Sequence, residues 1–127
     1  MKASYELHRA ADNGWIFQLK TGNNQVLLQS DSYRTLGGCL NGIESCREHS
    51  PYDRFYGRIE RSLHFTFHVK ASNNRVIGLG CASRSADERE NAIGLVKRYA
   101  QIAQIIDCTK KELTRIRQGY YEKDDQT

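Results

Sequence analysis

A seven-residue stretch occurs twice in the chain, and this repetition constrains the fold more than any other feature. Lys20–Val26 reads Lys-Thr-Gly-Asn-Asn-Gln-Val, and Lys70–Val76, fifty residues later, reads Lys-Ala-Ser-Asn-Asn-Arg-Val. Asparagine tolerates the left-handed backbone that tight turns require. Each stretch is therefore predicted to be a turn that joins two strands.

The similarity between the two regions extends beyond the turn. When residues 15–47 are compared with residues 65–97 without gaps, eight of the 33 positions are identical, whereas average composition would give roughly two. A tandem duplication explains this excess. The identical pairs are Phe17/Phe67, Lys20/Lys70, Asn23/Asn73, Asn24/Asn74, Val26/Val76, Arg34/Arg84, Asn41/Asn91 and Ile43/Ile93.

Around each turn, the residue pattern predicts three strands, a helix and one more strand. Residues 15–20 alternate apolar and polar side chains with period two, as in a half-buried strand. Thr35 is the candidate N-cap of the first helix, and Ser85 with Glu88 forms a candidate capping box for the second. The predicted strands are residues 4–9, 15–20, 25–30, 54–60, 65–70, 75–80 and 104–108, and the first helix is predicted at residues 36–49.

The end of the chain is predicted to be an addition to this pattern. Thr109 and Glu112 form another candidate capping box, which predicts a short C-terminal helix to about Gly119. The predicted organisation is one pseudo-two-fold domain over residues 1–127, with repeat one at residues 4–53, repeat two at residues 54–108, and a C-terminal helix and tail at residues 109–127.

Composition and charge restrict the class of protein. Hydrophobic residues make up 39% of the chain and charged residues 27%, which is typical of a soluble globular protein. No apolar run approaches the ~20 residues of a membrane-spanning helix, and residues 1–6 have no secretory signal pattern, so a cytoplasmic protein without membrane contact is expected. The net charge of +4 permits nucleic acid or an acidic partner without requiring either.

Four cysteines, Cys39, Cys46, Cys81 and Cys108, lack the C-x-x-C spacing of a structural zinc site. Disulfides are uncommon in the cytosol. The expected role of these cysteines is that of small buried hydrophobic residues, and a reactive or metal-binding thiol is the alternative.

Three short motifs resemble those of the YegP-like bacterial proteins, which are small domains of unknown function. They are Phe17–Lys20, Asn23–Leu27 and Asn41–Arg47, and each has a counterpart fifty residues later. The resemblance implies an α+β fold in which two units share one antiparallel sheet, exchange their last strands and place both helices on one face. It carries no catalytic residues. Two departures are Asn24 and Asn74 at the turn position where the family has glycine, and the extended C-terminus.

A candidate binding surface follows from strand alternation. His64 and His68 fall on the face opposite Phe65 and Phe67, and counting by parity adds basic side chains and one tyrosine to that face. Such a face could follow a phosphate backbone, although it lacks the stacking aromatics of sheet-based RNA-binding domains. An ordinary solvated face is the alternative. The candidate binding residues are Arg54, Tyr56, Arg58, His64, His68, Lys70 and Lys20.

No catalytic or metal-binding constellation is predicted. His64 and His68 are four residues apart, and on a strand this separates them by ~13 Å, too far to share one ion. Asn41 and Asn91 recur inside the helices and are expected to be structural, with each amide bonded to backbone of an adjacent turn or strand. We therefore predict no catalytic residues, no metal site and no cofactor.

The sequence favours a non-enzymatic binding module that engages or regulates a protein or nucleoprotein partner, as a monomer or weak dimer. Three alternatives stay open. The first is nucleic-acid binding through the basic sheet face, the second is a small enzyme with His64 or His68 as its general base, and the third is a purely structural dimerisation unit.

Overall fold

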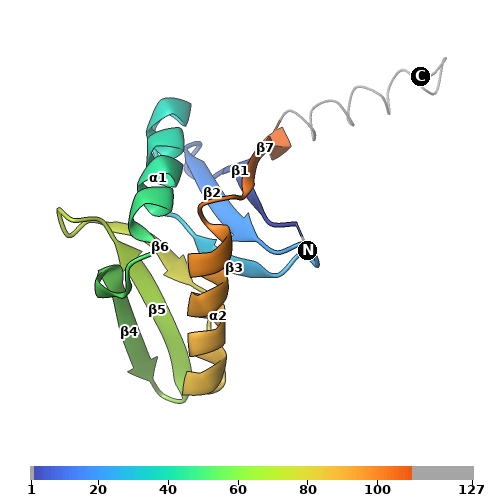
Figure 1. The fold of residues 1–127 in the computed structure, drawn as a ribbon. Helices are drawn as coiled ribbons and strands as arrows, with labels where there is room; N and C mark the ends of the chain where they lie inside the picture. Colours follow the sequence, from blue (N-terminus) through green and yellow to red (C-terminus); the bar gives the residue numbers. More distant parts are fainter. Residues whose placement is uncertain (1, 110–127) are drawn as a thin grey trace, which may run out of the picture.

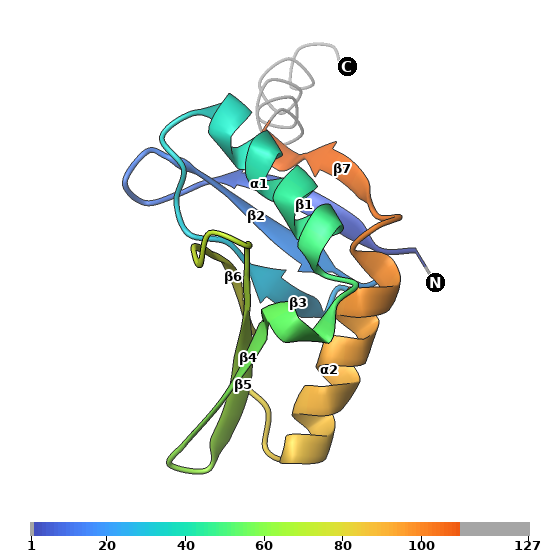
Figure 2. The ribbon, with the colours of Figure 1, turned by 60° about the vertical axis from the view of Figure 1, so that its left-hand side comes forward.

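The computed structural model describes residues 2–109, which form one seven-stranded sheet with two helices packed on the same face (Figures 1 and 2). The order of strands across the sheet is β4-β5-β6-β3-β2-β1-β7. The elements are β1 (Ser4–Arg9), β2 (Trp15–Lys20), β3 (Val26–Gln29), α1 (Leu36–His49), the 3-10 helix η1 (Asp53–Phe55), β4 (Tyr56–Arg61), β5 (His64–Lys70), β6 (Val76–Gly80), α2 (Ala86–Tyr99) and β7 (Gln104–Asp107).

The sheet consists of two halves that meet at β3 and β6. These two strands share only the pairs Leu28–Gly80 and Gln29–Leu79. Figure 2 shows β4 and β5 crossing the direction of β1 and β2 at a steep angle. Helix α1 and the strands β1–β3 are called the first half below, and α2 with β4–β6 the second half.

Both predicted Asn-Asn turns are confirmed. Asn24 has a φ of 71° and Asn74 a φ of 69°. The Asn24 amide donates to the Thr21 carbonyl at 3.0 Å, and the Asn74 amide donates to the Ala71 carbonyl at 2.9 Å. In each half the turn follows a register shift at the end of the preceding strand. The same turn conformation therefore joins β2 to β3 and β5 to β6.

The helices begin where their capping residues predict. The Thr35 side chain accepts from the amide of Gly38, and the Ser85 side chain accepts from the amide of Glu88. The capping box differs from the prediction in one bond, because the Glu88 carboxylate accepts from the Arg84 amide and not from that of Ser85. In both cases the cap satisfies an amide that the helix leaves without a partner.

The core lies between the helices and the inward face of the sheet. Tyr5 and Phe17 from the first half and Phe67 from the second are fully buried. The Tyr5 hydroxyl donates to the carbonyl of Ala100 at the end of α2 (2.5 Å), and the Tyr56 hydroxyl donates to the carbonyl of Ser50 at the end of α1 (2.7 Å). Each strand tyrosine thus satisfies a helix-end carbonyl inside the core.

The prediction of a wholly antiparallel sheet was wrong for one pair, because β7 runs parallel to β1. After α1 the chain enters β4, which pairs antiparallel with β5. The corresponding place beside β2 is already occupied by β1. The strand after α2 therefore adds to the outer edge of β1 and, since it runs in the same direction, pairs with it in parallel.

Two further predictions differ from the structure or lie beyond it. The fourth strand was predicted from Arg54 but begins at Tyr56, since residues 53–55 form η1. The predicted C-terminal helix lies outside the described residues, apart from Thr109. Neither α1 nor α2 has the length and apolar run of a membrane-spanning helix, and no other helix within residues 2–109 has them.

Candidate functional site

Side chains of alternate strand residues form the face of the sheet opposite the helices, here called the open face because no helix covers it within residues 2–109. Lys20, His64, His68 and Lys70 lie on this face, as predicted. Across the seven strands the pairing register assigns to the open face Ser4, Glu6, His8, Ile16, Gln18, Lys20, Val26, Gln29, Gly57, Ile59, Arg61, His64, Thr66, His68, Lys70, Val76, Leu79, Gln104 and Ile106.

Tyr56 and Arg58 were predicted on the open face, and this placement was wrong. The pairing register sets Tyr56 opposite Val69 and Arg58 opposite Phe67, so both point to the helix side. The error comes from the hairpin between β4 and β5, which is closed by two residues and pairs Arg61 with His64. With that loop length, odd positions on β4 lie opposite even positions on β5, and counting by parity alone selects the wrong face.

Arg58 takes part in an ion-pair network on the helix side. Its guanidinium lies 2.9 Å from the Asp53 carboxylate and 2.8 Å from the Glu90 carboxylate, and Lys97 lies 2.8 Å from Asp53. Hydrogen bonds from Arg58 and then Lys97 lower the pKa of Asp53 to about 2. This network connects η1 and β4 to α2.

Arg54, the remaining candidate, lies in η1 before the strand begins. Its guanidinium stacks on the rings of Tyr52 and Phe55, with centroid distances of 4.9 and 4.6 Å. It is exposed but is not part of the open face. Four of the seven candidate residues therefore share one surface, and three do not.

The imidazole of His68 lies across Gly57 on the neighbouring strand. A Cβ at Gly57 would come within 2.3 Å of His68 Nε2, so only glycine leaves room for the ring. Burial, with a smaller effect of Lys70, lowers the pKa of His68. His68 is therefore a neutral ring near pH 7, packed between Gly57 and Leu79.

The centre of the open face carries exposed apolar side chains. Val76 and Leu79 on β6 are 45% and 56% exposed. Leu79 lies opposite His68 on one side and Gln29 on the other. A groove of about 330 Å³ runs here, lined by Gln29, Ser30, Asp31, Val76, Gly78 and Leu79.

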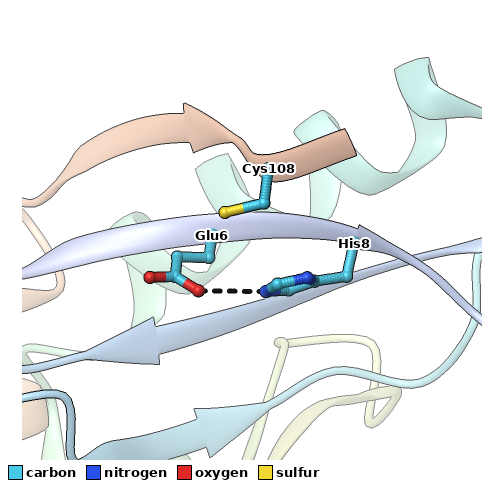
Figure 3. Close-up of side chains that lie close together, drawn as sticks. All are labelled: Glu6, His8 and Cys108. Atoms are coloured by element: carbon cyan, nitrogen blue, oxygen red, sulfur yellow. Dashed lines mark hydrogen bonds and ion pairs between the residues drawn. The ribbon is translucent and has the colours of Figure 1, made fainter. Parts of the chain in front are cut away.

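A second cluster on the open face lies near the β7 edge and was missed from the sequence. Glu6 and His8 on β1 are joined by a 3.0 Å contact between Oε1 and Nε2, and Lys20 Nζ lies 3.0 Å from the same oxygen. One ligand atom from each of Glu6, His8 and Cys108 lies within 4.8 Å of the others (Figure 3). The alternate spacing of Glu6 and His8 was visible in the sequence, but Cys108 joins them only through the parallel β1–β7 pair.

Two neighbouring side chains keep Glu6 negatively charged although it is partly buried. Burial by itself would raise the pKa of this carboxyl, but hydrogen bonds from Lys20 and His8 outweigh that effect and the pKa lies below its usual value. Glu6 is thus a carboxylate at neutral pH, and it provides the acidic group of this cluster.

Two equivalent grooves lie beside the helices. The first, about 340 Å³, lies between α1 and the β5–β6 turn, and the second, about 430 Å³, lies between α2 and Gln25. Asn41 and Asn91 line them at corresponding positions. Both asparagines are exposed and neither side chain makes a hydrogen bond within residues 2–109, so their predicted structural role was wrong.

The cysteines fall into two groups. Cys39 and Cys46 are fully buried in the core, as predicted, and burial raises the pKa of each thiol to about 11. Cys81 and Cys108 are only partly buried, so the prediction of buried thiols was wrong for these two. The difference follows from their places, since the first two face inward on α1 whereas Cys108 lies just after the edge strand β7.

Comparison with known proteins gives the family. Residues 10–56 match the domain of unknown function DUF1508. A UPF0339 protein of Shewanella oneidensis is 33% identical over 110 residues, covering 86% of this chain and all of the relative. The chain belongs to the UPF0339 family. The resemblance to YegP-like proteins is thereby confirmed.

Further members of the UPF0339 family agree in sequence and in fold. The YegP protein of Escherichia coli K12 is 35% identical over 110 residues, which cover 86% of this chain and all of YegP. A UPF0339 protein encoded 5′ of the ptx operon of Stutzerimonas stutzeri is 32% identical over 108 residues, 84% of this chain and 97% of that protein. The solution NMR structures of the Shewanella protein and of E. coli yegP each have a TM-score of 0.79 at 32% identity, covering 84% of this chain and 92% and 93% of theirs.

Proposed function

We propose that this UPF0339 member is a non-enzymatic binding module that engages an acidic segment of a partner protein through the open face. The observation that carries the proposal is the exposed pair Val76 and Leu79 at the centre of that face. Large apolar side chains are costly to leave in water in a contiguous groove, and such patches are typical of interaction sites.

Charge complementarity favours an acidic partner. Lys70 lies opposite Val76, and Arg61 lies farther along the same face. Neither forms an ion pair within the described part of the chain. A partner segment with one apolar side chain for the groove and flanking carboxylates would match this arrangement, with the charges chiefly raising the association rate and selecting the partner.

The arrangement of aromatic side chains favours protein over nucleic acid as the partner. Tyr56, the one aromatic residue predicted on the binding surface, is buried in the core. The described strands place no Phe, Tyr or Trp on the open face. Binding of single-stranded nucleic acid depends on such rings for base stacking, and Arg58 is engaged by carboxylates of its own chain.

We also infer that the two halves are copies of one unit that exchange their post-helix strands. Three observations support this inference. The two turns have matching left-handed asparagines, the strand tyrosines make matching bonds to helix ends, and the strand after each helix lies in the opposite half of the sheet. The open face would then combine two related surfaces that meet at β3 and β6.

Affinity capture with a matched pair of variants tests the proposed function. The full chain is used as bait in bacterial lysate, alongside Leu79→Asp and Leu63→Asp. Leu63 is 83% exposed at the β4–β5 hairpin tip, away from the groove, so it controls for the loss of an exposed leucine. The same protein should be retained by the wild type and by Leu63→Asp but lost with Leu79→Asp. Equal retention by all three baits would contradict the proposal, and loss of the partner after nuclease treatment would favour the nucleic-acid alternative.

A further inference from the structure

We propose that Glu6, His8 and Cys108 form a binding site for a zinc ion at the β1–β7 edge of the sheet. The site does not depend on the partner-binding role of the open face. It would link β1, near the beginning of the described chain, to Cys108, which follows β7 near its end.

Strand geometry explains why these three residues meet. Glu6 and His8 are two apart on β1 and therefore project to the same face. β7 runs parallel to β1 with Leu7 opposite Asp107, so the next position, Cys108, comes beside His8. Figure 3 shows the Cys108 sulfur, the Glu6 carboxylate and the His8 ring gathered around β1.

The spacing of the donor atoms fits a tetrahedral ion after a small adjustment. One donor from each residue lies within 4.8 Å of the others. Bonds of about 2.0–2.3 Å to zinc place two tetrahedral ligands roughly 3.3–3.8 Å apart. Side-chain rotation at three partly buried residues can close a gap of about 1 Å without any change in the strand pairing.

The donor set selects the class of ion. A thiolate, an imidazole nitrogen and a carboxylate oxygen together suit zinc or another borderline divalent transition metal, whereas calcium and magnesium prefer oxygen ligands alone. Three protein ligands leave a fourth position for water. Binding releases the thiol proton of Cys108 to solvent, since the thiolate is the form that coordinates.

Among residues 2–109, Lys20 is a cation that competes for this site. Its Nζ lies 3.0 Å from Glu6 Oε1, the oxygen that also contacts His8 Nε2. A bound ion must displace this lysine or use the other carboxylate oxygen. The Lys20→Gln variant is therefore expected to bind the ion more tightly than the wild type.

Bound zinc would connect β7 to β1. β7 has four residues and, within the described part of the chain, pairs with the sheet on one side only. Because an ion that binds only the folded state stabilises it by mass action, zinc should raise the melting temperature of the full chain.

Cobalt substitution tests the site directly. The full chain, kept reduced with a phosphine, is titrated with Co²⁺ and its absorption spectrum recorded, and Zn²⁺ affinity is measured by calorimetry. The wild type should develop a thiolate-to-cobalt charge-transfer band that zinc abolishes. Cys108→Ser should lose the band, and His8→Gln and Glu6→Gln should weaken binding by more than about tenfold, since losing even a group that only supports a ligand costs 10- to 100-fold.

Cys81→Ser is the matched control, because Cys81 is also partly buried but lies outside the cluster. It should keep the charge-transfer band and the wild-type affinity. The proposal is overturned if the wild type shows no thiolate band, if Cys108→Ser retains it, or if Cys81→Ser loses it. Circular dichroism of each variant separates loss of the site from loss of the fold, and Lys20→Gln, which keeps all three ligands, provides a gain in affinity that unfolding could not produce.

Discussion

The two helices lie in equivalent places, yet the surfaces around their first turns differ. In the first half, α1 has no acidic residue in its first turn, and Tyr33 lies over Gly42. In the second half, the first turn of α2 contains Asp87 and Glu88, and the groove has Ser83 in place of a tyrosine. The two helices therefore pack on the core in similar ways, whereas the residues that line the grooves beside them differ in size and charge.

Valine at the two turn asparagines should have the largest effect. A β-branched residue at φ near 70° is strained. Each change should destabilise the protein by about 1–2 kcal/mol, and the two changes combined in one variant by about 2–4 kcal/mol. Asn24→Val and Asn74→Val should therefore lower the melting temperature by similar amounts, and glycine at either site should be neutral or stabilising. Thermal unfolding measures this effect. An unchanged melting temperature in both valine variants would mean that the backbone at these turns is not left-handed.

Removal of the two core hydroxyls should have the next largest effect. Tyr5→Phe and Tyr56→Phe each leave a helix-end carbonyl without its partner inside the core, at a cost of about 1–3 kcal/mol. Urea unfolding of both variants compares the halves directly. If only one of the two variants lost stability, the two helix ends would not be equivalent.

The Gly42→Ala substitution should show that the two grooves differ in packing. An added Cβ would lie 2.3 Å from the Tyr33 hydroxyl, so the ring must move, at a cost of about 1–2 kcal/mol. In a Tyr33→Ser background, which reproduces the Ser83 and Ala92 pair of the second half, the same change should instead stabilise the helix by about 0.5–1 kcal/mol. A double-mutant cycle by urea unfolding tests this, and additive effects would contradict the contact.

The ion-pair network around Asp53 should have the smallest effect and appear only in acid. The pKa of Asp53 is lowered to about 2 by Arg58 and Lys97, below its ordinary value. Its contribution to stability is therefore fully present above about pH 4 and is lost as the pH falls toward 2. The decrease in melting temperature over that range should be smaller in Arg58→Gln than in the wild type, and an identical decrease would exclude the network as a source of acid sensitivity.

The sequence predicted local structure well wherever the structure of a segment depends on neighbouring residues alone. The strand that ends at Lys20, the helix that begins after Thr35 and the left-handed Asn24 and Asn74 each depend on neighbouring residues, and all are as expected. The family was also recognisable, because the motifs recur in a fixed order.

Relations between segments could not be obtained in the same way. The β4–β5 hairpin turns at Ser62 and Leu63 with φ values of 50° and 67°. Neither residue type indicates a two-residue turn, so the register was missed and Arg58 was placed on the wrong face. Cys108 lies near Glu6 because β7 pairs in parallel with β1. This pairing follows from the fact that β1 already occupies the position beside β2, which the sequence did not reveal. Both failures affected the candidate site because that site combines residues from different strands.

The most direct test of the proposed binding face is site-specific photocrosslinking in living bacteria. A photoreactive phenylalanine analogue replaces Leu79 on the open face or Glu44 on the exposed side of α1. The proposal predicts one crosslinked partner from position 79, weaker crosslinking after Lys70→Glu, and no crosslink to that partner from position 44. Equal crosslinking from both positions, or crosslinking from position 44 alone, would contradict binding through the open face.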